Sequence, residues 1–298
     1  MKIRSVHIVL GLVFIFLLCF PQIAKEGAWA GLTLWARTVI PVLFPFILAS
    51  NLFAALGMAA GKWYAILLGF LCGYPMGAKA AGDLVKQGAV TREQGQWLMC
   101  CCNLPSPMFL TGFIRIPAVT LAVYLPALLL LLPVFFFRPK QEKGILFPDT
   151  SLSSMSLPAL SHSRPPHEPQ ASPASLQLLL EQAMEQSVKL IIKIGIYIMI
   201  FSILSVCIQK ITILDPFIRT LLLGLNEMTI GISTAKSMGF SLRRQAILST
   251  VFCTFGGLSG LSQTKSVTED TGLSMNYYIC VRLIHVLISL GLLFFLIR

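Results

Sequence analysis

GYPMGAK, at Gly73–Lys79, interrupts an apolar stretch long enough to lie in a membrane, and it decides how the surrounding chain can fold. Pro75 has no backbone N–H and disfavours helical geometry at Tyr74, while Gly73 and Gly77 remove side-chain bulk. Non-helical backbone at membrane depth is tolerated only where protein or a water-filled cavity supplies hydrogen-bond partners. The stretch therefore predicts either a kink in a membrane helix or one wall of a binding site.

A second interruption of the same kind follows at NLPSP, Asn103–Pro107, and weaker counterparts lie in the C-terminal part of the chain. These counterparts are Gly231 with its neighbours Thr229 and Ser233, and the run GGLSG at Gly256–Gly260. One broken segment alone would favour a structural kink. Because a pair of apolar segments interrupted by glycine and proline is the best sequence indication of a transporter binding site, we expect a site where the breaks meet.

The average composition of the chain is strongly apolar. Of its 298 residues, 56% are hydrophobic and only 12% are charged, and the mean hydropathy is +0.80. A soluble domain carries about 25% charged residues, so the composition excludes a large water-soluble catalytic domain, a fully disordered chain and a collagen-like repeat. The net charge of +11 fits the basic excess at the cytoplasmic ends of membrane spans, and the basic residues are scattered singly, so no nucleic-acid partner is expected. The predicted class is an all-α polytopic protein embedded in the lipid bilayer.

Apolar runs predict about seven to nine membrane segments, since a helix needs about 20 apolar residues to cross the hydrocarbon core. The first, Val6–Phe20, follows Lys2 and Arg4 and is interpreted as a retained span rather than a signal peptide. Arg138–Ser175 is rich in proline and serine and is expected to be a disordered linker. Leu176–Val188 has the apolar stripe of an amphipathic helix at the membrane interface. The other expected spans are Thr38–Gly61, Trp63–Ala78, Gln94–Ile114, Ile116–Phe137, Leu190–Gln209, Phe217–Ala235, Gln245–Thr264 and Met275–Ile297.

The sequences on the two sides of the linker resemble each other. Gly77 aligns with Gly231, and each of these glycines is followed by a Gly-x-x-x-Arg-x-Gln loop, a second broken span and a closing span. We assume a cytoplasmic N-terminus and take Gln94–Ile114 and Gln245–Thr264 as re-entrant hairpins, and the two repeats are then inverted in the membrane. In this topology slightly more lysine and arginine residues lie on the cytoplasmic side than outside, as expected. Many secondary transporters use such inverted repeats with discontinuous helices for alternating access.

Several ionisable residues lie in or next to the expected spans, and three of them are candidates for function: Lys79, Glu227 and Arg282. Charges in hydrocarbon are costly and by default indicate a pathway or an ion pair, although Lys79 and Arg282 can instead reach the interface from helix ends. Glu227 stands inside a broken span, and we expect it to be a buried partner for a basic residue or a proton or cation site. His285 follows Arg282 by three residues and is interpreted as a structural histidine.

The binding site is expected at the breaks, where helix N-termini inside the protein present free amides and the positive end of the helix dipole. With Lys79 and Arg92 nearby, this arrangement favours an organic anion as the solute. The candidate substrate-binding residues are Asn51, Gly73, Pro75, Gly77, Lys79, Asn103, Ser106, Pro107, Glu227, Thr229, Ser233, Gly256, Gly257 and Arg282.

Sequence motifs for catalysis and metal binding are absent. There is no GxSxG, HExxH, Walker A or dinucleotide-binding pattern, so neither an enzyme activity nor a cofactor is expected. The eight cysteines contain no CxxC pair, and successive side chains of Cys100–Cys102 would point about 100° apart on a helix. We interpret the cysteines as small buried hydrophobes and expect no metal site. The sequence leaves open whether a proton or a sodium ion is the coupling ion.

Several motifs are similar to those of one family. FPFILASNL at Phe44–Leu52, GYPMGAK, REQ at Arg92–Gln94, CN at Cys102–Asn103 and TFGGLS at Thr254–Ser259 resemble the sporulation integral membrane protein family of the YlbJ type. That family belongs with proteins bearing the nucleoside-recognition, or Gate, domain and is distantly similar to concentrative nucleoside transporters. The LPSP that follows Asn103 departs from the Gly-Pro ending of the family pattern. The resemblance divides the chain into an N-terminal span at 1–26, Gate-like repeats at 27–137 and 176–298, and the linker at 138–175.

The resemblance also implies a function. It implies an endospore-forming Gram-positive bacterium, expression in the mother cell, and a place in the membrane around the forespore. It further implies export of a small anionic metabolite from the mother cell toward the forespore, with dipicolinate, an aromatic dicarboxylate, as the expected solute. A nucleoside transporter and a non-transporting scaffold that recruits sporulation proteins through the linker are the alternatives, and a homo-oligomer or a sporulation partner protein is left open.

Overall fold

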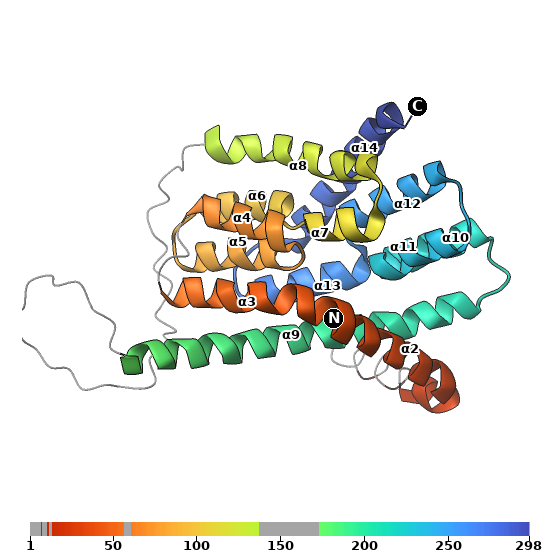
Figure 1. Cartoon of the computed structure of the whole chain (residues 1–298), viewed down its shortest axis with the longest axis horizontal. Coiled ribbons are helices and arrows are strands. Elements are labelled where there is room, and N and C mark those ends of the chain that lie inside the picture. The colour runs from red at the N-terminus through yellow and green to blue at the C-terminus, as the bar shows by residue number, and fades with distance from the viewer. Residues whose placement is uncertain (1–6, 8–10, 12–13, 57–60, 137–172, 298) are drawn as a thin grey trace, which may run out of the picture.

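The computed structural model describes residues 7, 11, 14–56, 61–136 and 173–297, and the regular elements in this part of the chain are all helical (Figure 1). Of the expected first span, Val6–Phe20, residues 7, 11 and 14–20 are described, and 14–19 are helical. The linker, Arg138–Ser175, lies outside the described residues except for 173–175, which begin α9 (Pro173–Lys210). Four helical segments are long and apolar enough to cross a membrane: Pro21–Ala55, Arg92–Ile114, Gln177–Lys210 and Met275–Leu296. The predicted all-α membrane protein class is confirmed.

Two long helical segments pack against each other along one side of the molecule (Figure 1). They are the continuous series α2 (Pro21–Leu34), η1 (Trp35–Val39) and α3 (Ile40–Ala55), and the 38-residue α9 (Pro173–Lys210). A Cβ on Gly27 would lie 2.4 Å from the Cα of Ile203, and one on Gly31 would lie 2.7 Å from the Cα of Met199. Small residues at these positions therefore allow the two backbones to approach closely. The segment Leu176–Val188, expected at the interface, is continuous with the following span in α9.

The chain reverses direction at two of the predicted breaks. The helices that meet there, α4 (Lys62–Cys72) with α5 (Met76–Lys86) and α10 (Pro216–Asn226) with α11 (Met228–Ser237), pack against each other as hairpins. At 1.5 Å per residue, an eleven-residue helix such as α4 is about 16 Å long, roughly half the hydrocarbon core. Each hairpin therefore enters and leaves at the same end of the bundle. The expectation that Trp63–Ala78 and Phe217–Ala235 each cross as one span is wrong for this reason.

At the other two breaks the chain continues in the same direction (Figure 1). The first broken helix consists of α6 (Arg92–Cys102), α7 (Pro107–Phe109) and η2 (Leu110–Ile114), and the second of α12 (Leu242–Phe255) and α13 (Gly257–Thr268). The 23 residues of Arg92–Ile114 extend about 35 Å as a helix, which is enough to cross a bilayer. The expectation that Gln94–Ile114 and Gln245–Thr264 are re-entrant hairpins is therefore wrong.

Contacts at the two ends of the unbroken helix α14 (Met275–Leu296) fix this direction. At its start, the Gln96 side chain of α6 donates to the backbone oxygen of Ser274 at 3.1 Å. Near its end, the Arg243 guanidinium lies 5.8 Å from the ring centre of Phe294. Lys236, which precedes Arg243 by one short loop, donates to the backbone oxygen of Phe113 in η2. The first broken helix thus begins at one end of α14 and finishes at the other.

Both halves of the described chain show the same order of elements. The first half has the hairpin α4–α5, the broken helix α6–η2 and the unbroken α8 (Pro117–Phe136), and the second has α10–α11, α12–α13 and α14. The loop between α5 and α6 (87–91) and the loop between α11 and α12 (238–241) lie at opposite ends of the bundle (Figure 1). Inverted orientation of the two halves in a bilayer stays a prediction.

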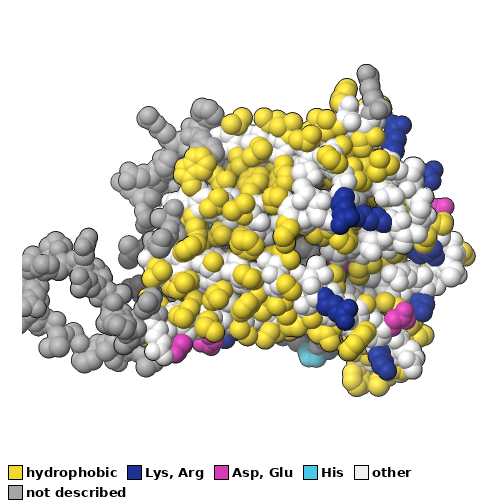
Figure 2. Space-filling view, viewed as in Figure 1, with side chains coloured by type: hydrophobic (Ala, Val, Ile, Leu, Met, Phe, Trp, Pro, Cys, Tyr) yellow, Lys and Arg dark blue, Asp and Glu magenta, His cyan; other side chains and the backbone are white. Residues whose placement is uncertain are grey.

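The outer surface carries many large apolar side chains. Leu128 and Leu129 on α8 and Leu287 and Phe295 on α14 are about half exposed or more. Figure 2 shows hydrophobic side chains across most of the visible face, with lysine and arginine gathered toward one end. Soluble monomers rarely expose contiguous apolar areas of this kind, whereas bilayer hydrocarbon covers them. The predicted integral membrane localisation is confirmed.

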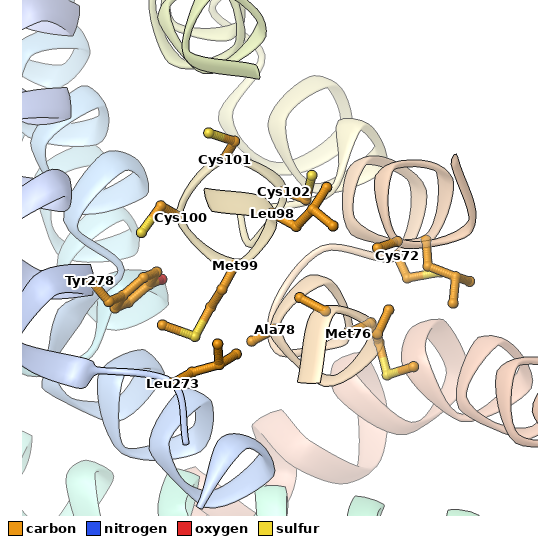
Figure 3. Packing of buried hydrophobic residues seen from close by; sticks show 14 of the residues in the cluster. Cys72, Met76, Ala78, Leu98, Met99, Cys100, Cys101, Cys102, Leu273 and Tyr278 are labelled. Carbon is orange, nitrogen blue, oxygen red and sulfur yellow. The ribbon is translucent and has the colours of Figure 1, made fainter. Parts of the chain in front are cut away.

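The interior around α4, α5, α6 and α14 is filled by sulfur-containing and small side chains (Figure 3). Cys100, Cys101 and Met99 point from α6 in different directions, as successive helical residues do (Figure 3). These cysteines, with Cys72 and Cys253, are buried as small hydrophobes, as predicted, whereas Cys19 and Cys280 are exposed.

Close packing between α5 and α6 depends on a glycine. A Cβ on Gly77 would lie 2.4 Å from the backbone oxygen of Cys102, which has no room to move. We expect Gly77→Ala to lower the free energy of unfolding by about 1–3 kcal/mol, the usual effect of overpacking. Thermal unfolding in detergent measures this, with Gly291→Ala as the control, because a Cβ there meets no atom within 4 Å. Equal stability of the two variants would contradict the prediction.

Candidate functional site

A cavity of about 340 Å³ lies where the four breaks approach η1, α3 and α9. Ligand pockets for small molecules begin at about this volume. Most of its wall is apolar, and polar groups come chiefly from the breaks and from α13. The lining residues with polar side chains are Thr38, Tyr74, Ser106, Glu227, Thr229 and Gln263. The arrangement can hold a small, partly apolar molecule with a few polar contacts.

The first two breaks touch each other through Gly73. This residue ends α4 with φ +79°, a left-handed conformation that L side chains rarely adopt. A Cβ on Gly73 would lie 2.6 Å from the backbone nitrogen of Ser106, in the second break. The Ser106 hydroxyl accepts a hydrogen bond from the backbone nitrogen of Phe109 at 3.3 Å and caps the helix that restarts at Pro107. Because position 73 has no side chain, the backbone of the first break can pack directly against the backbone of the second break.

Glu227 places a buried carboxylate on the cavity wall. It is 5% exposed, and it caps α11 because Oε1 accepts hydrogen bonds from the Thr229 backbone nitrogen at 3.0 Å and from the Thr229 hydroxyl at 2.6 Å. Among the described residues, none of the salt bridges involves Glu227. The expected pairing of Glu227 with a lysine or arginine is therefore not seen, and the carboxylate stays available to a proton, a cation or a hydrogen-bond donor.

The fourth break lies at Gly256 and Gly257, which have φ values of +89° and +68°. Gly256 lines the cavity, and a Cβ on it would lie 2.6 Å from the Tyr74 hydroxyl oxygen. A Cβ on Gly257 would instead lie 3.2 Å from the backbone oxygen of Gly224 in α10. At both positions glycine is needed because φ is positive and a Cβ would come too close to neighbouring atoms. These two residues shape the break and offer a solute no side-chain contacts.

Asn103 ties the two halves together. The side chain is fully buried, and its amide nitrogen donates to the Thr264 hydroxyl at 2.8 Å and to the Tyr278 hydroxyl at 2.9 Å. Its side-chain oxygen accepts from the backbone nitrogen of Ala78 at 3.3 Å. Asn103 thus supplies the hydrogen-bond partners that interrupted backbone needs, away from the cavity.

Arg282 lies in the same polar network, fully buried. Its Nε donates to the Tyr278 hydroxyl at 3.0 Å, and one terminal nitrogen donates to the Tyr74 hydroxyl at 3.3 Å. The other terminal nitrogen lies 3.3 Å from Nδ1 of His285, whose Nε2 lies 3.0 Å from the Val123 backbone oxygen. Because that oxygen only accepts, Nε2 of His285 carries the proton and Nδ1 accepts from Arg282. The alternative that Arg282 reaches the membrane interface is wrong.

The predicted site residues therefore separate into two groups. Ser106, Glu227, Thr229 and Gly256 line the cavity. The other ten do not line it: Asn51, Gly73, Pro75, Gly77, Lys79, Asn103, Pro107, Ser233, Gly257 and Arg282. Many of these ten hold the breaks in place.

Three of the residues outside the cavity have other surroundings. Asn51 donates to the Ser187 hydroxyl at 2.9 Å, which links α3 to α9. Lys79 forms a 2.6 Å ion pair with Asp83 one turn later on α5. Ser233 is exposed on α11, because it lies on the opposite face of that helix from the buried Gly231 and Ile232. Helical periodicity around Gly231 could have placed Ser233 away from the break.

Most cavity residues were not among the candidates, and Tyr74 and Gln263 are two polar examples. Tyr74, directly between Gly73 and Pro75, lines the cavity and donates from its hydroxyl to the Cys253 backbone oxygen at 3.1 Å. Gln263, one turn beyond Ser259 on α13, also lines it. The position of Tyr74 inside the break is a signal that the sequence already offers, whereas the apolar wall from η1, α3 and α9 depends on how distant segments pack.

Comparison with known proteins found a similar protein. The chain is 23% identical to the sporulation integral membrane protein YlbJ of Bacillus subtilis (strain 168), over 89% of this chain and 75% of that protein. The expected resemblance to the YlbJ-type family is confirmed. No family model matches the chain, and no solved structure matches it. The similarity to YlbJ agrees with a membrane role in sporulation.

Proposed function

We propose that this protein is a membrane transporter of a small organic anion in sporulation, with dipicolinate as the solute carried from the mother cell toward the forespore. The observation that carries the proposal is the cavity at four helix breaks, with both halves of the chain in its wall. Transporters commonly bind their solutes where discontinuous helices from two repeats meet. A protein that only anchors others to the membrane does not need a hollow of this kind.

The chemistry of the wall suits an aromatic acid. Phe109, Phe113 and Tyr74 provide ring surfaces, and Ser106, Thr38 and Gln263 provide hydrogen bonds. Glu227 opposes an anion unless it is protonated or a cation enters as well, because like charges repel strongly at low dielectric. The proposal therefore includes a proton or a sodium ion that moves with the anion.

Flux into liposomes tests the proposal. The full-length protein is reconstituted, and labelled dipicolinate uptake is measured with an imposed proton gradient, with a sodium gradient and with neither. We expect protein-dependent uptake that is faster with one gradient and that unlabelled dipicolinate inhibits more strongly than a nucleoside does. Absence of protein-dependent uptake under all three conditions would refute transport of this solute, and stronger inhibition by the nucleoside would favour a nucleoside transporter.

A further inference from the structure

Arg282 is a buried charge without a counterion. Among the described residues, no aspartate or glutamate forms a salt bridge with it, and its side chain is 0% exposed. Its partners are all neutral: the hydroxyl groups of Tyr278 and Tyr74 and the unprotonated Nδ1 of His285. Burial of an unpaired guanidinium is costly, so a structural tie between helices would be served better by neutral groups.

The guanidinium also has unused hydrogen-bonding capacity. It carries five N–H groups, and three of them have acceptors among the described residues. Each terminal nitrogen keeps one N–H group without a recorded acceptor. A guanidinium binds a carboxylate most strongly through two N–H groups, and two remain here for such a ligand.

One side chain separates this guanidinium from the cavity. Tyr74 lines the cavity, and its hydroxyl accepts from Arg282 at 3.3 Å while donating to the Cys253 backbone oxygen at 3.1 Å. The Arg282 charge lies 5.6 Å from the centre of the Tyr74 ring. Tyr74 lies between Gly73, which has φ +79°, and Pro75, in the break that separates α4 from α5. Displacement of Tyr74 would join Arg282 to the cavity.

We propose that Arg282 is the anion-binding group of this transporter and that Tyr74 covers it until a carboxylate of the solute replaces the tyrosine hydroxyl. The inference rests on the proposed function and specifies its substrate class: a molecule that enters the cavity must carry at least one carboxylate. An apolar or aromatic body then occupies the walls formed by Phe109 and Phe113. The charge of Arg282 also offsets the charge of the solute in a cavity that already holds Glu227.

Binding to the purified full-length protein tests this inference with two probes of the same shape, dipicolinate and the uncharged pyridine-2,6-dicarboxamide. We expect Arg282→Gln to weaken dipicolinate binding by roughly tenfold or more, because hydrogen bonds between a guanidinium and a carboxylate are stronger than those between neutral groups. The same substitution should leave binding of the diamide unchanged. Tyr74→Phe removes the hydroxyl that competes for Arg282 and should tighten dipicolinate binding by about fivefold, the worth of one net hydrogen bond. Tyr124→Phe is the matched control, because the Tyr124 hydroxyl donates to the Pro105 backbone oxygen and does not contact Arg282.

The outcomes separate the inference from the function it rests on. If the wild-type protein binds neither probe, the proposed function fails for this solute. If the wild-type protein binds dipicolinate and Arg282→Gln binds it equally well, or loses both probes equally, Arg282 is structural and the inference is overturned. If Arg282→Gln does not fold, Tyr74→Phe decides: tighter binding than in Tyr124→Phe supports the inference, and unchanged binding overturns it.

Discussion

Replacement of Gly260 by phenylalanine is expected to reduce solute flux by roughly tenfold or more while leaving the protein folded. Gly260 is buried on α13 and lines the cavity, yet a Cβ built on it meets no atom within 4 Å. A side chain at this position must therefore extend into the empty space where the solute is expected. Because Gly is less favourable than other residues inside a helix by about 1 kcal/mol, the substitution does not weaken α13 itself.

The size of the effect follows from overlap with the solute. Forcing extra volume into a filled site costs about 1–3 kcal/mol, so flux at subsaturating solute should fall by roughly tenfold or more. Gly291→Phe on α14 is the control, since a Cβ there also meets nothing within 4 Å but the residue is on the exposed outer surface. Proteoliposome uptake and thermal unfolding are measured for both variants. Normal uptake by a folded Gly260→Phe protein would place the solute path elsewhere.

Cysteines at Gln87, Arg115 and Ser241 are expected to report two sides of the membrane. Gln87 follows α5, at the end of the bundle where the hairpin α4–α5 enters. Arg115 follows η2 and Ser241 precedes α12, and both lie at the opposite end of the bundle. A membrane-impermeant maleimide should therefore label Arg115→Cys and Ser241→Cys from the same side and Gln87→Cys from the opposite side. The background protein lacks Cys19 and Cys280, because these native thiols are exposed.

Arg115 makes this experiment decisive. If Arg92–Ile114 folded back as a hairpin, Arg115 would return to the side of Gln87. If it crosses, Arg115 joins Ser241. Labelling of Arg115→Cys together with Gln87→Cys would refute the direction that the fold gives to the first broken helix. Labelling of Gln87→Cys and Ser241→Cys from one side would refute the inverted arrangement.

Three of the four break positions were predictable from the sequence because their causes are local, whereas the break expected at Gly231 lies at Glu227, and Gly231 is inside α11. Pro75 disfavours helical geometry at Tyr74, and Gly73 and Gly256 permit the positive φ with which the chain leaves α4 after Cys72 and α12 after Phe255. The apolar composition likewise determined that the chain lies in a membrane. Glu227 and Ser106 were expected from the sequence as polar residues in broken segments, and the structure adds that both cap the helices that restart there.

The direction of the chain after each break was decided only by the tertiary structure. A local interruption is compatible with reversal or with continuation, and the choice depends on which backbone comes close, as when Gly69 and Gly77 both pack on the Cys102 carbonyl and hold α4 and α5 beside α6. The surroundings of Arg282 were decided in the same way: its tyrosine partners come from positions 208 and 4 residues away in the chain. By itself the sequence determined that this is an interrupted helical membrane protein, because composition and glycine–proline chemistry act locally, whereas the cavity and its covered arginine required packing between segments that the sequence does not place side by side.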